Sequence, residues 1–139
     1  MPALDKYHQA VRHALERDGW TITSENMALD FGGVKMFIDL RAEQLLIAER
    51  GRQKIAVEVK SFLEPSTLSA FQDAVGQYLS YLVALESVEP DRVLYLAAPQ
   101  AIWQPFSQLP FTQAVAKRAE LRVIVFDPIL EEVIQWIQP

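Results

Sequence analysis

The sequence contains no cysteine and only two histidines among its 139 residues. Without cysteine the chain has no disulfide, no thiolate nucleophile and no cysteine-based zinc or iron–sulfur site. The two histidines, His8 and His13, are spaced so that they do not share one face of a helix, and they therefore do not form a metal-binding pair. Any metal should be a hard ion with oxygen ligands, such as Mg²⁺.

Long apolar runs are also absent. Charged residues interrupt every hydrophobic stretch well before the roughly 20 residues that a membrane span needs. The first residues lack the basic and apolar segments of a secretion signal. We therefore expect a cytoplasmic protein without a membrane partner. Half of the residues are hydrophobic, and the length is typical of one domain, so residues 1–139 are predicted to form a single domain.

The net charge of −5 is unevenly distributed along the chain. Positions 35–60 hold six of the 13 basic residues but only four of the 18 acidic residues. The six basic residues are Lys35, Arg41, Arg50, Arg52, Lys54 and Lys60. The acidic total argues against non-specific coating of nucleic acid. The local excess of basic residues is compatible with weak contact to a phosphate backbone or with docking of an acidic partner. The ordinary interpretation of these basic residues is a solvated turn.

The hydrophobic pattern predicts helices and strands in an alternating order. Apolar spacing indicates a helix from Leu4 to the Asp18-Gly19 stop, a long helix from Ser66 to about Glu86, and a helix around 111–119. Ser66 is expected to cap the long helix. An apolar stripe is expected on that helix at Leu68, Phe71, Val75, Leu79, Leu82 and Val83. Strands are expected at 20–23, 34–40, 45–48, 55–60, 93–98, 121–126 and 133–137.

These elements predict an α/β fold with a mixed central sheet flanked by helices. Gly51 lies between two strand-like runs and can adopt a positive φ, so those strands should form an antiparallel hairpin. The runs at 93–98 and 121–126 are apolar throughout, which is typical of strands buried on both faces. The segment around Trp136 is expected to be an edge strand.

The tripeptide Glu58-Val59-Lys60 is the most informative motif. Strand side chains alternate between faces, so Glu58 and Lys60 project from the same side, opposite to Ile55, Val57 and Val59. Two further acids, Asp39 and Glu43, precede it at a distance that one hairpin can close. A carboxylate, a hairpin and Glu-x-Lys form the minimal pattern for a divalent-metal site with a lysine beside it.

The order of these elements resembles the restriction-endonuclease-like, or PD-(D/E)xK, nuclease fold. The resemblance implies that Glu58 and an upstream acid hold Mg²⁺ or Mn²⁺, and that Lys60 positions or activates the attacking water. It favours Glu43 as the upstream ligand, because short members place their acid at that distance from Glu-x-Lys. Asp39 is then the alternative ligand or a neighbour of the site.

The following helix adds two candidates. Gln77 and Tyr81 match a Gln-x-x-x-Tyr pattern that some branches of the superfamily carry, and one helical turn separates them. Glu16 on the first helix is a weaker candidate for another carboxylate. Each feature also has an ordinary explanation: Glu-x-Lys is common as a solvated ion pair, and the helix residues can be surface or half-buried packing residues. The agreement of acids, hairpin and helix favours a site.

Segments along nearly the whole chain are similar to the XisH family. They include the Asp-Gly-Trp-Thr-Ile-Thr run at 18–23, Ile-Asp-Leu at 38–40, Lys-Ile-Ala-Val-Glu-Val-Lys-Ser-Phe at 54–62, Glu-Pro-Asp-Arg-Val-Leu-Tyr-Leu-Ala at 89–97, Val-Phe-Asp-Pro at 125–128 and Gln-Trp-Ile at 135–137. One departure is Arg41, where the family commonly has glycine after Asp-Leu. If that glycine allows close approach of phosphate or metal, Arg41 weakens the site.

The resemblance implies a function in DNA rearrangement. XisH proteins control excision of the fdxN DNA element during heterocyst differentiation in cyanobacteria, together with a recombinase and a partner called XisI. We therefore expect DNA, an XisI-like protein and a site-specific recombinase as partners, and a homodimer is also compatible with the sequence. The expected function is an excision controlling factor with Mg²⁺-dependent endonuclease-like chemistry. The alternative is a non-catalytic adaptor that binds DNA or a recombination partner.

Overall fold

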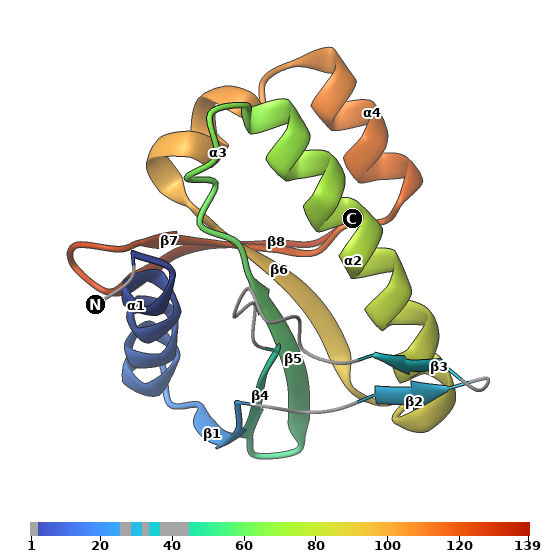
Figure 1. Ribbon diagram of the computed structural model, residues 1–139. Coiled ribbons are helices and arrows are strands. Elements are labelled where there is room, and N and C mark those ends of the chain that lie inside the picture. Colours follow the sequence, from blue (N-terminus) through green and yellow to red (C-terminus); the bar gives the residue numbers. More distant parts are fainter. Residues whose placement is uncertain (1–2, 26–28, 32–33, 37–44) are drawn as a thin grey trace.

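The apolar strand segments assemble into one six-stranded sheet, described by a computed structural model that covers residues 3–25, 29–31, 34–36 and 45–139 (Figure 1). The sheet order is β1-β4-β5-β6-β7-β8. These strands are β1 (Thr21–Ser24), β4 (Leu45–Arg50), β5 (Gln53–Val59), β6 (Val93–Pro99), β7 (Val123–Asp127) and β8 (Glu132–Ile137). The β5–β6 and β6–β7 pairs are parallel, and the other pairs are antiparallel. The predicted mixed sheet is confirmed, with β8 at one edge.

Helices cover both faces of this sheet. The elements are α1 (Ala3–Arg17), α2 (Thr67–Val88), α3 (Gln100–Phe106) and α4 (Pro110–Arg118). Helix α1 packs on one face, where Val11 and Leu15 join the cluster that contains Val57. Helices α2 and α3 pack on the other face, where Phe71 and Trp103 join the cluster that contains Ala56. Successive residues of β5 therefore contribute to opposite cores, as the strand alternation requires.

The central strands are buried on both faces. Leu94 and Leu96 of β6 lie in the core beneath α2, whereas Tyr95 and Ala97 lie in the core beneath α1. This arrangement confirms the prediction from the continuous apolar run. The β4–β5 hairpin is also confirmed, and Gly51 at its turn has a φ of 62°. That conformation is favourable for glycine because it has no Cβ.

Helix α2 faces the sheet differently from the predicted stripe. Phe71 is buried as expected, but Leu68, Leu79 and Val83 are 45%, 42% and 52% exposed. The buried residues of the helix are instead Ala70, Phe71, Ala74, Tyr78, Ala84 and Leu85. Several of them are alanines, whose small side chains let a helix approach the sheet closely. Val75 and Leu82 are partly buried against the same core, so the stripe is confirmed in part. Its other half was wrong because a count of large apolar residues overlooks the alanines and the tyrosine.

Strand β2 (Leu29–Phe31), its pairing with β3 (Val34–Met36) and helix α3 were not predicted. The two strands form a separate antiparallel ribbon beside α2 instead of joining the main sheet (Figure 1). The predicted strand at 34–40 is confirmed only for 34–36, because its remainder lies outside the described residues. Helix α3 contains Pro105. A proline inside the pattern hides a helix from periodicity arguments, since proline removes a backbone donor.

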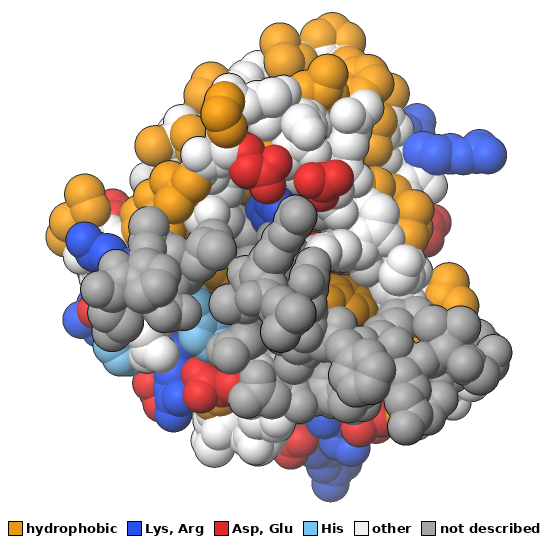
Figure 2. All heavy atoms as spheres, viewed as in Figure 1, with side chains coloured by type: hydrophobic (Ala, Val, Ile, Leu, Met, Phe, Trp, Pro, Cys, Tyr) orange, Lys and Arg blue, Asp and Glu red, His pale blue; other side chains and the backbone are white. Residues whose placement is uncertain are grey.

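Exposed hydrophobic side chains gather at one end of the molecule. Figure 2 shows them over the end where α3 and α4 lie with the first turns of α2. Leu68, Leu109 and Phe111 are among the exposed apolar residues in or next to these helices, and Leu63 is exposed in the segment before α2. The described helices include none that is both long enough and apolar enough to cross a bilayer.

Candidate functional site

Glu58 and Lys60 lie at the carboxyl end of β5, on the side of the sheet that α2 covers. Glu58 alternates with Val57 and Val59, which lie in the core beneath α1. Both polar residues are buried, with exposed fractions of 1% for Glu58 and 6% for Lys60. Burying ionisable groups costs free energy unless they are stabilised by other groups. A buried acid and a buried amine at one strand end are therefore a candidate functional site.

The backbone after β5 fixes the position of Lys60. Its amide donates to the Ala97 carbonyl at 3.0 Å, which extends the pairing with β6 beyond the strand end. Two residues later, Phe62 has a φ of 58° while its side chain is buried in the core beneath α2. A bulky residue in the left-handed region is uncommon and strained. The burial of Phe62 holds this turn in place.

Glu64 is a nearby carboxylate that the sequence interpretation missed. Its Oε1 lies 3.2 Å from the Lys60 ammonium nitrogen, and its side chain is partly exposed whereas that of Lys60 is buried. The signal available in the sequence was only an acid four residues after the lysine, just before Pro65. The ion pair of Lys60 with Glu64 therefore joins a buried amine to a carboxylate that solvent can reach.

Helix α2, which covers this face of the sheet, carries three polar side chains that are buried or half-buried. Gln77 is half-buried, and its Oε1 is buried without a hydrogen-bond donor among the described residues. Tyr81 is half-buried and packs against the core beneath α2. Between them in sequence, Tyr78 is fully buried in that core. Tyr81 therefore lies at the core on the sheet face that carries Glu58, and the buried Oε1 of Gln77 is shielded from solvent.

Tyr78 interacts electrostatically with Glu58. Burial is the main reason why the pKa of Tyr78 is raised above its ordinary value of 10.0. Hydrogen bonding and charge at Arg122 act in the opposite direction, while the negative charge of Glu58 raises the pKa further. The hydroxyl accepts from the Arg122 amide and donates to the Leu94 carbonyl, each at 3.2 Å. Tyr78 is thus a neutral hydrogen-bonding group near the carboxylate.

The predicted upstream ligands, Asp39 and Glu43, lie outside the described residues, as does Arg41. In the part of the chain that the structure describes, no three acidic or histidine side chains are grouped to hold a metal ion. The Glu58 carboxylate is nevertheless a hard oxygen donor of the kind that Mg²⁺ prefers. Among the described residues, Glu58 is therefore the one predicted ligand, and its carboxylate is compatible with Mg²⁺.

Glu16 does not join Glu58. It is exposed on α1 and lies 3.8 Å from Arg12 in an ion pair one helical turn away. Helix α1 packs against Val57 and Val59, on the opposite face of the sheet from Glu58. The weak prediction that Glu16 adds a carboxylate to the site was wrong, because the first helix crosses the other side of the sheet.

Comparisons with known proteins converge on one family. The family model described as XisH protein matches residues 1–134. An XisH family protein from Nostoc punctiforme PCC 73102 has a similar structure, with 41% identity, a TM-score of 0.89 and coverage of 96% of this chain and 100% of that chain. An fdxN element excision controlling factor protein from Anabaena variabilis has 43% identity, a TM-score of 0.89 and coverage of 96% and 99%. The search of curated proteins found no match.

Proposed function

The chain belongs to the XisH family, and on that premise we propose that it is a controlling factor for excision of a DNA element, with Mg²⁺-dependent phosphodiester chemistry of the restriction-endonuclease-like kind. The observation that carries the proposal is the burial of Glu58 and Lys60 at one end of β5. This pair lies where the resemblance to PD-(D/E)xK nucleases requires a metal ligand and an amine.

Chain connectivity favours Glu43 over Asp39 as the second ligand. Leu45, the first residue of β4, lies directly opposite Glu58. Glu43 precedes Leu45 by two residues, and two residues span at most about 7 Å. Asp39 precedes Leu45 by six residues, which span at most about 20 Å. On this ground we infer Glu43 as the second ligand of an ion bound by Glu58, because the longer connection to Asp39 sets no such limit.

Each side chain has a separate chemical role in the proposal. Glu58 and Glu43 would hold Mg²⁺, which when bound polarises a phosphate and lowers the pKa of a coordinated water. The Lys60 ammonium would stabilise negative charge that develops on the phosphate. Glu64 would keep that ammonium in position, at its observed distance of 3.2 Å. Gln77 and Tyr81 would contact substrate or water from α2.

A plasmid-cleavage assay tests the enzymatic claim. We expect Mg²⁺ or Mn²⁺ to support nicking or cutting of supercoiled DNA by the wild-type chain, and Glu58→Gln and Lys60→Met to abolish it. Glu16→Gln is the matched control, because Glu16 lies on the other face of the sheet and should leave cleavage unchanged. Melting curves of all variants check the fold. Activity that is absent from the wild type, or that persists in both site variants, would remove the enzymatic claim.

A non-catalytic adaptor is the second candidate function. The observation that favours it is the ion pair between Lys60 and Glu64, since a buried amine already neutralised by a carboxylate can serve structure alone. In this case an XisI-like protein and a site-specific recombinase would be the partners, and DNA cleavage would belong to the recombinase. Pull-down with the XisI-like partner, using wild type and Glu58→Gln, separates the two functions. Equal partner binding and equal support of excision by both chains would favour the adaptor.

A further inference from the structure

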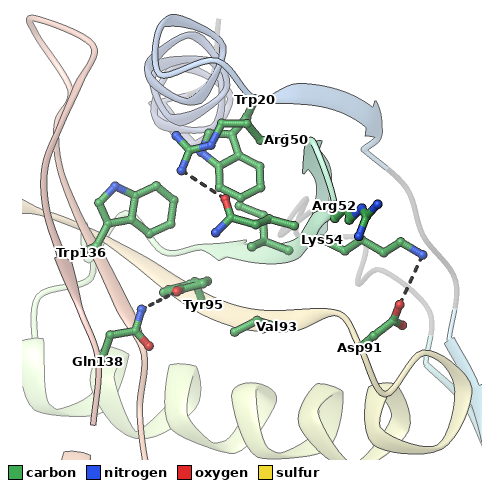
Figure 3. Close-up of a pocket in the computed structure, with 11 residues that line it drawn as sticks. Trp20, Arg50, Arg52, Lys54, Asp91, Val93, Tyr95, Trp136 and Gln138 are labelled. Atoms are coloured by element: carbon green, nitrogen blue, oxygen red, sulfur yellow. Dashed lines mark hydrogen bonds and ion pairs between the residues drawn. The ribbon is translucent and has the colours of Figure 1, made fainter.

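A pocket of about 340 Å³ lies at the opposite end of β5 from Glu58, beside the β4–β5 hairpin (Figure 3). Its floor is formed by Ile55, Val93 and Tyr95, which lie at or near the beginning of two parallel strands. Ile55 and Tyr95 belong to the core beneath α1. The pocket is thus on the α1 side of the sheet, where the strand beginnings remain accessible. It is separate from the candidate metal site on the α2 side.

Aromatic rings form the walls of this pocket. The Trp136 ring lies 5.9 Å from the Trp20 ring and 5.1 Å from the Tyr95 ring, measured between centroids. The Tyr95 hydroxyl accepts a hydrogen bond of 2.6 Å from the Gln138 amide nitrogen, which fixes the ring against β8. Figure 3 shows Trp20 and Tyr95 on opposite sides of the opening, with Trp136 joining them. Trp20 and Tyr95 are buried, with exposed fractions of 5% and 7%, so the half-buried Trp136 offers the ring surface on which a planar ligand can stack.

The rim of the pocket is basic. Arg50, Arg52 and Lys54 line it together with one acid, Asp91. The Arg50 guanidinium lies 4.6 Å above the Trp20 ring and donates to the Asp18 carbonyl at 2.8 Å. Lys54 lies 3.3 Å from Asp91 in an ion pair. These contacts hold two of the three cations in place at the mouth.

Arg52 differs from its neighbours at the rim. It is exposed at the hairpin turn, and no carboxylate of the described residues pairs with it. An arginine carries five donors in a planar fork that matches a phosphate group. The lining as a whole has three basic residues and one acidic residue, on a protein whose net charge is −5. The pocket therefore favours an anion against the overall charge of the chain.

We infer that this pocket binds a nucleotide, with the base against the half-buried Trp136 ring and the phosphate at Arg52. An anion with a flat ring can contact both the aromatic wall and the basic rim, whereas inorganic phosphate can contact only the basic rim. An acidic peptide satisfies only the rim. Gln53, whose Oε1 accepts from Arg50 at 3.2 Å, retains its amide nitrogen to recognise a base edge. The nucleotide is either free or the single-stranded end of a nucleic acid.

Tryptophan fluorescence in metal-free buffer tests this inference. Trp20 and Trp136 line the pocket, whereas Trp103 is buried on the other side of the sheet. Deoxyadenosine monophosphate and a deoxythymidine hexanucleotide are the nucleotide probes, and inorganic phosphate and hexaglutamate are the comparison anions. We expect saturable quenching by the nucleotide probes only. Equal affinity for both probes identifies a free nucleotide as the ligand, and tighter binding of the hexanucleotide identifies a strand end.

Two charge variants sharpen the test. Arg52→Gln should weaken nucleotide binding about tenfold, because one charge-assisted phosphate contact is lost. Arg118→Gln is the matched control, since Arg118 is exposed at the end of α4 away from the pocket, and it should bind as the wild type does. The inference is overturned by absence of saturable quenching, by quenching with hexaglutamate of equal affinity, or by an Arg52→Gln chain that binds normally. Because no metal is present, these outcomes are independent of DNA cleavage at Glu58.

Discussion

At the scale of single residues, the Tyr78 hydroxyl joins three segments beneath the candidate site. It belongs to α2, donates to the Leu94 carbonyl of β6 and accepts from the Arg122 amide just before β7. A buried backbone group that loses its hydrogen-bond partner costs more than the bond itself contributed. Tyr78 therefore couples the packing of the helix to two central strands.

Replacing Tyr78 by phenylalanine should destabilise the fold. We expect Tyr78→Phe to lower the free energy of unfolding by about 1–3 kcal/mol, because a buried donor and acceptor lose their shared partner. Urea unfolding followed by circular dichroism measures the change. Tyr7→Phe is the control: the Tyr7 ring packs against Phe126, but its hydroxyl has no partner among the described residues, and its effect should stay within about 0.5 kcal/mol. Equal effects of both variants would contradict this role.

Glu25 should make stability depend on pH in the acidic range. Burial acts to raise its pKa, but contacts with His8 at 3.1 Å and Arg12 at 2.7 Å hold that pKa below the ordinary value of 4.5. A carboxyl group with a lowered pKa stabilises the folded state above its unfolded pKa, and this contribution is lost as the pH falls through the folded pKa.

The matching variant is Glu25→Gln. At pH 7 it should unfold with about 0.5–1 kcal/mol less free energy than the wild type, and the difference should shrink progressively below pH 4.5. Urea unfolding between pH 3 and pH 7 provides the measurement. Glu86→Gln, at an exposed position of α2, should show no such pH dependence. A difference that grows on acidification would reverse the assigned sign.

The sequence predicted residues whose roles follow from local geometry. Strand alternation was sufficient to place Glu58 opposite Val57 and Val59. Tyr78 and Glu64 were missed because their contacts depend on tertiary structure: the tyrosine reaches strands far along the chain, and the acid approaches Lys60 only after the strained turn at Phe62. No spacing rule contains that information.

At the scale of elements, the N-terminus of α2 follows the expected capping chemistry. The Ser66 hydroxyl accepts from the Ser69 amide at 3.1 Å, which satisfies one of the free donors of the first turn. The helix begins directly after the segment that carries Lys60 and Glu64. Its cap therefore helps to define where the site ends and the helix starts.

Removing this cap should destabilise α2. Ser66→Ala is expected to lower the free energy of unfolding by about 1 kcal/mol, because the Ser69 amide loses its acceptor. Ser69→Ala removes a neighbouring hydroxyl without removing the cap and should be close to neutral. Thermal unfolding of both variants makes the comparison. A larger loss for Ser69→Ala than for Ser66→Ala would show that the cap has no energetic role.

The bounds of α2 could be predicted, but its orientation could be predicted only in part. Its start at Ser66 and its end near Glu89 follow from capping and from the proline that comes next. The face that it presents to the sheet is set by Ala70 and Ala74, which allow a close approach, and by the hydrogen bonds of Tyr78. Large apolar residues such as Leu79 consequently remain exposed.

At the scale of the whole molecule, the sheet was predictable because each strand carries its own signal. Continuous apolar runs identified β6 and β7 as central, and the hairpin at Gly51 fixed the pairing of β4 with β5. The position of the β2–β3 ribbon beside α2 could not be predicted, because each of its two strands is only three residues long. The single domain and a homodimer stay predictions.

The two surfaces proposed for ligands lie on opposite sides of the sheet. The candidate metal site is at the carboxyl end of β5 under α2, and the aromatic pocket is near the amino end of the same strand on the α1 side. Strand β5 therefore connects a site proposed for phosphodiester chemistry to a site proposed for nucleotide binding. Each can be tested by variants that leave the other intact.

Isothermal titration calorimetry with Mn²⁺ measures whether Glu58 and Glu43 bind a metal ion. We expect saturable binding to the wild-type chain, at least tenfold weaker binding to Glu58→Gln and to Glu43→Gln, and unchanged binding to Glu16→Gln on the opposite face of the sheet. If Asp39→Asn weakens Mn²⁺ binding more than Glu43→Gln does, the upstream ligand is Asp39 and the proposed metal site remains. Equal Mn²⁺ affinities of Glu58→Gln and the wild type would show that Glu58 is not a metal ligand.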